Sequence, residues 1–448
     1  MSAPIGTTLA GLVRGPDRRL ARMRVALRLC AVAAAVSSIS CARVAPRVSA
    51  PLEVEQRSFP ASTSAHTDSE FVAGNRVEIL LNGDGTFPRM LEAIRGARRS
   101  VTVEQYFFGP GPIADDFVNA LAERCRNGVK VHLLLDSVGA KGIPDPLAAL
   151  LESSGCELEW FRPLHPTRFL TPWELFEYNN RTHRRILVVD GEVGFTGGYG
   201  ISEAWMGDGA HPDVWRDTNV EVRGPVVRQL QGAFVQDWWA TTDTALVGDD
   251  YFPALEPAGG VTAEVVESSP GAGTSPSYMM FFLAITAARR SIYVTNPYFV
   301  IDDAMKDAFI AAAHRGVQVV VLVPGRLEHE LTRVDQNLVH YAGRGELGDL
   351  LAGGVRVFEY KAALLHAKTM TVDGIWSTVG STNLDPRSFN LNDEINLTIL
   401  DEGVTKQLED AFWRDVAISP EVTYEDWQSR GLKQRFFELF AIPAKSQL

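Results

Sequence analysis

The chain has 448 residues, of which 46% are hydrophobic and 22% charged. This is the composition of a globular protein, and it excludes a chain that is disordered or that consists mainly of membrane-spanning segments. The formal net charge of −12 argues against a protein that coats nucleic acid, because such proteins present a basic face. The length suffices for two core-bearing halves or for one large duplicated domain.

Residues 1–41 differ in composition from the rest. Several arginines precede an apolar, alanine-rich run from Leu29 to Val36, and small residues follow up to Cys41. The run is shorter than the about 20 residues that span a bilayer, so the pattern predicts an export signal or a lipoprotein-type leader that ends at Cys41. We therefore expect a membrane-associated protein, exported or lipid-anchored in a bacterial cell envelope. An uncleaved leader without structure is the alternative.

Residues 42–74 are rich in Ser, Pro, Ala and Thr and lack apolar periodicity, which predicts a linker. Further along, Cys125 and Cys156 have a spacing that suits no metal site. Two buried free thiols are the favoured interpretation, and a disulfide formed after export is the alternative.

The rest of the chain repeats one pattern, in residues 75–245 and again in 261–420. Residues 98–103 and 289–294 share Arg-Arg-Ser followed by a strand, and residues 127–135 and 315–323 share a helix end with glycine followed by an apolar strand. Such strands are typical of sheets covered by helices on both faces. We predict a duplicated α/β fold, each half with a mixed sheet flanked by helices, a junction at 246–260 and a C-terminal helix and tail at 421–448.

Each half contains one chemistry-bearing motif. Residues 183–191 and 366–374 both read His, any residue, a cation, four residues, Asp, Gly, and a further glycine follows each at the same offset. The composition predicts only about 0.1 such patterns by chance, so two in matching places indicate a shared function.

The spacing within the motif has a chemical meaning. His183 and Arg185, and likewise His366 and Lys368, lie two residues apart on a strand and point to the same face. Two imidazoles with a cation beside each would form a pocket for a phosphodiester, in which one attacks phosphorus and the other protonates the leaving alkoxide. The cations would stabilise charge on the phosphoryl oxygens. This chemistry requires no metal and no cofactor.

The paired motifs resemble those of the phospholipase D superfamily, and most closely those of bacterial cardiolipin synthases, from about Val77 to Phe412. The resemblance implies that the two halves share one active site and that a phosphatidyl group passes through a phosphohistidine to an alcohol or to water. It implies that His183 is the nucleophile and His366 the general acid/base, although the sequence also allows the exchange of these roles. Arg185 and Lys368 would bind phosphate.

Further site residues follow from the same resemblance. Asp217 would orient His183, and Glu394 would orient His366, so that each imidazole has the useful tautomer. Asp190 and Asp373 complete the catalytic motifs, with a turn role as the alternative because Asp-Gly favours turns. The remaining residues share a place beside the pocket: Glu104, Gly198, Ser381 and Asn383.

Two positions depart from the pattern of this superfamily, both in the first half. Arg185 stands where a lysine is usual, and Tyr199-Gly200 stands where an asparagine-bearing loop is usual. Arg and Lys differ in reach and hydration. The first half-site is therefore the one whose chemistry needs testing.

Two segments are candidates for contact with lipid. The stretch from Leu164 to Tyr178 is unusually aromatic, which suits either insertion into a bilayer or packing across the two halves. The stretch from Leu432 to Phe440 is amphipathic, and docking on the core is favoured there.

The leading hypothesis is a phosphatidyltransferase that forms cardiolipin from phosphatidylglycerol at a membrane surface. A phospholipase D or phosphodiesterase that ends the reaction in water is the second, and a non-catalytic lipid-binding protein is the third. Nucleic acid is not an expected partner, and the sequence leaves the oligomeric state open.

Overall fold

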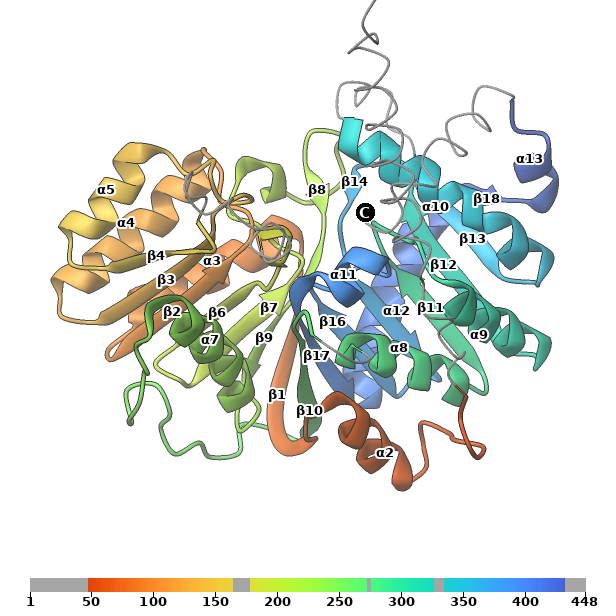
Figure 1. The fold of residues 1–448 in the computed structure, drawn as a ribbon, viewed down its shortest axis with the longest axis horizontal. Coiled ribbons are helices and arrows are strands. Elements are labelled where there is room, and N and C mark those ends of the chain that lie inside the picture. The colour runs from red at the N-terminus through yellow and green to blue at the C-terminus, as the bar shows by residue number, and fades with distance from the viewer. Residues whose placement is uncertain (1–46, 164–177, 272–274, 326–333, 432–448) are drawn as a thin grey trace, which may run out of the picture. The chain divides into compact units, whose positions relative to one another are not determined.

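The structure is a computed structural model that describes residues 47–163, 178–271, 275–325 and 334–431, the side chains of 334–342 excepted (Figure 1). Residues 1–47 and 48–448 form separate units, and the elements described below belong to the second. The leader, residues 164–177 of the aromatic stretch and the amphipathic stretch from Leu432 lie outside the described residues. No helix in the described ranges is long and apolar enough to cross a membrane.

The first half supplies strands and helices in alternation. Its strands are β1 (Val72–Leu81), β2 (Ser100–Gln105), β3 (Lys130–Asp136), β4 (Glu157–Phe161), β5 (Arg181–Thr182), β6 (Ile186–Val189), β7 (Val193–Gly197), β8 (Trp215–Arg216) and β9 (Thr218–Arg223). Its helices are α2 (Ser58–Thr67), α3 (Asn82–Gly96), α4 (Pro112–Arg126), α5 (Asp145–Ser153), the 3-10 turn η1 (Glu203–Trp205) and α7 (Val227–Thr242).

The second half repeats this succession. Its strands are β10 (Val261–Ser268), β11 (Ser291–Thr295), β12 (Gln318–Pro324), β13 (Arg356–Tyr360), β14 (Leu364–Leu365), β15 (Thr369–Val372), β16 (Trp376–Gly380), β17 (Asn392–Leu400) and β18 (Glu421–Val422). Its helices are α8 (Pro276–Ala287), α9 (Asp303–His314), α10 (Val334–Ala352), α11 (Pro386–Asn390), α12 (Glu402–Ala417) and α13 (Tyr424–Gln428).

Within the described ranges, sixteen of these strands form one mixed sheet in which β1 and β10 lie side by side between the halves (Figure 1). Outward from this centre the first half has the order β1-β9-β7-β6-β2-β3-β4, and the second has β10-β17-β16-β15-β11-β12-β13, with β18 outermost. Along this order β2, β3 and β4 are parallel to one another, as are β11, β12 and β13, and the other neighbours are antiparallel. The sixteenth strand, β5, pairs with β17 in parallel. The predicted duplicated α/β fold is confirmed.

The predicted two-sided burial of the apolar strands is also confirmed. In β12, Val319 and Val321 pack into one hydrophobic cluster, and Val320 and Leu322 pack into another. The glycines before β3 and β12 have φ angles of 84° and 90° at Gly128 and Gly316, so each helix ends in a left-handed turn.

The region predicted as a linker contains structure instead. Helix α2 occupies Ser58–Thr67, and Phe59 is fully buried in the core of the second half. Only Phe59, Thr63 and Thr67 of this helix are buried, and both threonine hydroxyls donate to carbonyls four residues earlier. The buried face of α2 is narrow and mostly polar, which explains why the composition of residues 42–74 indicated a linker.

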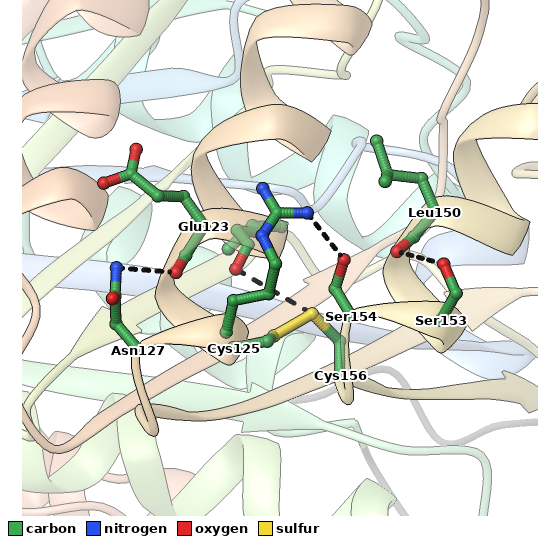
Figure 2. Close-up of a disulfide and its surroundings, with 9 residues drawn as sticks. Glu123, Cys125, Asn127, Leu150, Ser153, Ser154 and Cys156 are labelled. Atoms are coloured by element: carbon green, nitrogen blue, oxygen red, sulfur yellow. Dashed lines mark hydrogen bonds between the residues drawn. A yellow bond between two sulfur atoms is a disulfide. The ribbon is translucent and has the colours of Figure 1, made fainter.

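The two cysteines of the first half are bonded to each other. Cys125 lies in the last turn of α4 and Cys156 precedes β4, and their Cα atoms lie 5.4 Å apart in a disulfide (Figure 2). The prediction of free thiols is therefore wrong. The two residues are 31 apart in sequence, and only the packing of α4 and α5 against the sheet brings them together.

Candidate active site

Each catalytic motif forms the first strand of a β-hairpin, β6–β7 or β15–β16. The aspartate of each motif lies at the turn, where Asp190 and Asp373 both have a φ angle of 54°. The Asp190 carboxylate accepts hydrogen bonds from three backbone N–H groups, those of residues 98–100, and Asp373 does the same for residues 289–291. From the rise of a strand, these carboxylates lie roughly 20 Å from the motif histidines. Their contacts support the turn role and not the catalytic one.

The segment before each motif crosses to the other half of the protein. Strand β5 pairs with β17, and the backbone N–H of His183 donates to the carbonyl of Asp393 at 2.8 Å. Strand β14 pairs with β8, and the N–H of His366 donates to the carbonyl of Arg216 at 2.8 Å. Each histidine is therefore anchored beside the strand that follows the opposite motif.

Because β5 and β14 each pair with a strand of the other half, each imidazole is oriented by a carboxylate from that other half. His183 Nδ1 lies 2.9 Å from Glu394 Oε1, and His366 Nδ1 lies 2.9 Å from Asp217 Oδ2. The predicted pairs, Asp217 with His183 and Glu394 with His366, are therefore wrong. They followed proximity along the chain, whereas β5 and β14 place each histidine against the other half.

The tautomer of each imidazole follows from these partners. Because an ionised carboxylate only accepts, each Nδ1 carries the proton and donates it, which leaves a lone pair on each Nε2. Arg185 Nη2 lies 3.0 Å from Nε2 of His183, and Lys368 Nζ lies 3.0 Å from Nε2 of His366. The Nε2 lone pair of each imidazole thus faces the basic side chain of its own motif.

Arg185 occupies the same place as the lysine of the other motif. Its Nη1 donates to the carbonyl of His183 at 2.8 Å, and Lys368 Nζ donates to the carbonyl of His366 at 2.7 Å. Both cations are almost completely buried. The substitution of arginine for lysine therefore preserves the contacts with the histidine carbonyl and with Nε2 that Lys368 makes in the second motif.

The four groups of the two motifs form one electrostatic site. Burial, together with the basic side chains of both motifs, lowers the pKa of His183 to about 4 and that of His366 to about 3. Burial also lowers the pKa of Lys368 well below its usual value. Since the charge of Lys368 lowers the pKa of His183 and that of Arg185 lowers the pKa of His366, the two halves share this site.

The two carboxylates remain ionised at neutral pH. Burial alone would raise the pKa of Asp217 and that of Glu394, but the contact with the adjoining imidazole and the further hydrogen bonds, from Trp205 to Asp217 and from Ser381 to Glu394, outweigh it, and both pKa values are lowered. The resting site therefore contains two neutral imidazoles and two ionised carboxylates, together with the Arg185 guanidinium and the amino group of Lys368.

The predicted loop residues lie beside these groups. The hydroxyl of Ser381 donates to Glu394 Oε2. Asn383 is buried, and its Oδ1 accepts no hydrogen bond from the described residues. A Cβ atom on Gly198 would lie 2.3 Å from Asp217 Oδ1, so this position requires glycine.

Glu104 lies on the other face of the sheet from the motif histidines. Its carboxylate accepts a hydrogen bond from Thr182, and it neighbours Arg184 and Asp237 of the α7 layer. Burial raises its pKa well above the usual value. Glu104 supports the strand that leads to His183 and does not contact either imidazole, in contrast to the predicted place beside the pocket.

Aromatic side chains contact both imidazoles, and one of these, Trp205, was not predicted as a site residue. Tyr106 meets His183 edge to face at 4.9 Å between ring centroids. The ring centroids of Trp205 and Trp215 lie 5.3 Å and 4.9 Å from that of His366. Trp205 follows the atypical Tyr199-Gly200 segment, which was the only signal that this region differs from its counterpart.

Comparison with known proteins agrees with this geometry. The family model described as "Cardiolipin synthase, PLD-like domain" matches residues 90–238 and 282–416. Cardiolipin synthase A of Pseudomonas aeruginosa is 35% identical over 370 residues, 82% of this chain and 72% of that protein. The cardiolipin synthase of Geobacillus kaustophilus is 32% identical over 366 residues, 81% of this chain and 70% of that protein.

A solved structure shares the fold at much lower sequence identity. The phosphatidylserine synthase of Haemophilus influenzae superimposes with a TM-score of 0.64 and 13% identity, covering 87% of this chain and all of that one. This likeness concerns the fold alone, and the family follows from the sequence matches. The chain belongs to the phospholipase-D-like cardiolipin synthase family and is a transferase of the phospholipase D superfamily.

Proposed function

We propose that the protein transfers a phosphatidyl group between phospholipids through a phosphohistidine, and that it forms cardiolipin from two molecules of phosphatidylglycerol. The observation that carries this proposal is the pair of imidazoles, each held at Nδ1 by a carboxylate 2.9 Å away and each facing a cation at Nε2. The names of the similar proteins support the choice of product.

The first step forms a nitrogen–phosphorus bond. His183 is neutral and its Nε2 carries a lone pair, so it can attack the phosphorus of the bound phosphatidylglycerol. As the bond from phosphorus to the glycerol oxygen breaks, His366 gives a proton from Nε2 to that oxygen, and glycerol leaves. His366 takes up this proton at Nε2 from solvent when the lipid binds, because the anionic phosphodiester raises its proton affinity and offsets the burial and the cations that lower its pKa in the resting site.

The second step regenerates the enzyme. The hydroxyl of a second phosphatidylglycerol gives its proton to His366 and attacks the phosphohistidine, which releases His183 and cardiolipin. Arg185 and Lys368 would hold the non-bridging phosphoryl oxygens in both steps, where charge stabilisation in a water-poor site is strongest. The unpaired Oδ1 of Asn383 is suited to accept a hydrogen bond from a substrate hydroxyl.

The reaction is tested with purified protein and phosphatidylglycerol labelled in its phosphate, in mixed micelles, with and without added glycerol. Cardiolipin that diminishes when glycerol is added supports reversible phosphatidyl transfer. Phosphatidic acid as the main product would replace the proposal by hydrolysis. Wild type no more active than His183→Ala and His366→Ala would contradict every enzymatic function on this lipid.

The covalent intermediate has a test of its own. A phosphohistidine is stable in alkali and labile in acid, so label that remains on the quenched protein should show this pattern. We expect label on wild type and on His366→Ala, and none on His183→Ala. The reverse result would exchange the roles of the two histidines without overturning the mechanism.

We further infer that the folded domain works in an oxidising compartment at a membrane surface. The support is the Cys125–Cys156 disulfide together with the export-type composition of residues 1–41. Protein recovered from its native cell envelope should resist thiol alkylation at both cysteines until a reductant is added. Alkylation of both residues without reductant would contradict this localisation.

A further inference from the structure

The buried side chain of Trp205 contacts His366 in two ways. Its indole Nε1 donates to Asp217 Oδ2 at 2.8 Å, and the same oxygen lies 2.9 Å from Nδ1 of His366. The two rings also meet edge to face, at 89° and 5.3 Å between centroids. One carboxylate oxygen thus joins the indole to the imidazole.

The other half achieves the corresponding contact with a different residue. Glu394, which orients His183, accepts a hydrogen bond from the hydroxyl of Ser381. Ser381 is fifteen residues after His366, and the same offset from His183 leads to Gly198. Because a Cβ atom on Gly198 would lie 2.3 Å from Asp217 Oδ1, no serine fits there.

The second departure of the first half belongs to the same arrangement. Gly200 has the offset that Asn383 has in the second half, and a Cβ atom on Gly200 would lie 2.9 Å from two atoms of the Trp205 ring. A Cβ atom on Gly83 would lie 2.1 Å from the Trp205 carbonyl oxygen. The glycines around this tryptophan therefore leave the space that it occupies.

We propose that Trp205 is a positioning residue of the active site, whose indole N–H holds the carboxylate that orients His366, as Ser381 does for the carboxylate that orients His183. This inference deepens the proposed function and rests on it for the catalytic consequence. With two donors on one oxygen, the Asp217 carboxylate keeps its orientation and attracts the proton of His366 less strongly.

Trp205→Phe tests this role, because it keeps a ring and removes the N–H. In the kcat–pH profile, we expect the limb that reports the titration of His366 to move to higher pH by about one unit. A shift of this size corresponds to the free energy of about one hydrogen bond to a charged group. We expect kcat at neutral pH to fall about tenfold and KM to change by less than about twofold. The charged groups that act on His366, namely Asp217, Lys368 and Arg185, are all retained in this variant.

Two variants serve as controls. Trp215→Phe also changes a ring beside His366, but among the described contacts its indole donates no hydrogen bond to Asp217, so the limb should stay in place. Ser381→Ala removes the hydroxyl that donates to Glu394, so it should shift the limb of the kcat–pH profile that reports His183 and leave the limb of His366 in place. An unchanged His366 limb in Trp205→Phe would overturn the proposal.

A readout independent of activity separates this inference from the proposed function. The imidazole nitrogens of His366 are titrated by NMR in wild type and in Trp205→Phe, and the same upward shift is expected. If wild type forms no cardiolipin, this titration still decides the role of Trp205. If Trp205→Phe does not fold, benzothienylalanine at position 205 keeps the size of the indole, replaces N–H by sulfur and should give the same shift.

Discussion

His183 Nδ1 lies 2.9 Å from Oε1 of Glu394, although 211 residues separate them in the chain. The reciprocal contact of His366 with Asp217 spans 149 residues. Each half therefore supplies one imidazole and the carboxylate that orients the imidazole of the other half. Neither half contains a complete histidine–carboxylate pair, and the interface between them is part of the candidate active site.

The crossed pairs predict which histidine each carboxylate serves. In Glu394→Gln the side chain keeps its shape but loses its charge, and an amide that donates to Nδ1 would favour the wrong tautomer of His183. We expect kcat to fall about 10²–10⁴-fold with little change in KM, as for other oriented imidazoles. Single-turnover labelling should show that Glu394→Gln slows formation of the phosphohistidine.

Asp217→Asn should lower kcat to a similar extent, through His366. Glu104→Gln is the matched control, because Glu104 is also buried in this sheet but faces α7, and its raised pKa makes glutamine a mimic of the protonated acid. The control should keep kcat per folded molecule. Wild-type kcat in Asp217→Asn would contradict the orienting role that we assign to this contact.

The sequence predicted the motif residues and the fold because both depend on local patterns repeated in each half. Periodicity, glycine offsets and charge at fixed spacing are visible along the chain. The crossed carboxylates were predicted the wrong way round because β5 and β14 are two residues long and leave no periodic signal. Trp205 was missed for a related reason, since its contact with Asp217 depends on space left by two glycines, the distant Gly83 and the atypical Gly200.

Arg185 should be replaceable by lysine. Its guanidinium makes the same two contacts to His183 that Lys368 makes to His366, so Arg185→Lys is expected to keep kcat within about tenfold. Arg185→Ala removes a charge that faces the phosphoryl oxygens, and it should lower kcat about 10²–10³-fold. Steady-state kinetics on phosphatidylglycerol compare the two. A loss in Arg185→Lys as large as in Arg185→Ala would show that the forked guanidinium itself is required.

The motif aspartates should affect stability and not chemistry. Asp373 accepts hydrogen bonds from the backbone N–H groups of residues 289–291, and its removal leaves these donors without their acceptor. Asp373→Ala should lower the free energy of unfolding by about 2–4 kcal/mol, because hydrogen bonds to a charged acceptor are worth about 1.5–3 kcal/mol each and water replaces part of them. Urea denaturation measures the loss, and kcat per folded molecule should stay near wild type. A large fall in kcat with unchanged stability would restore the catalytic role.

The pH dependence of stability should reveal how α2 is attached. Ser64 and Ser69, in and just after this helix, donate to Oε2 of Glu264 in β10, and burial raises the pKa of Glu264 to about 7. Since this pKa exceeds the value of about 4.5 in the unfolded chain, the folded protein binds the extra proton between these pH values. The contribution of Glu264 to stability is therefore fully present below about pH 4.5 and is lost as the pH rises through about 7.

Glu264→Gln mimics the protonated acid and should remove this dependence. We expect the free energy of unfolding of the variant, relative to that of wild type, to be about 3 kcal/mol higher at pH 8 than at pH 4.5. This figure follows from about 1.4 kcal/mol for each unit by which the pKa differs between the folded and unfolded chain. Other buried carboxylates with raised pKa values, such as Asp385 and Asp393, are present in both proteins and cancel in the difference. Ser69→Ala should act in the opposite sense, because its hydroxyl lowers the pKa of Glu264. Equal differences at the two pH values would mean that Glu264 titrates as it does in the unfolded chain, and that the attachment of α2 does not depend on its protonation.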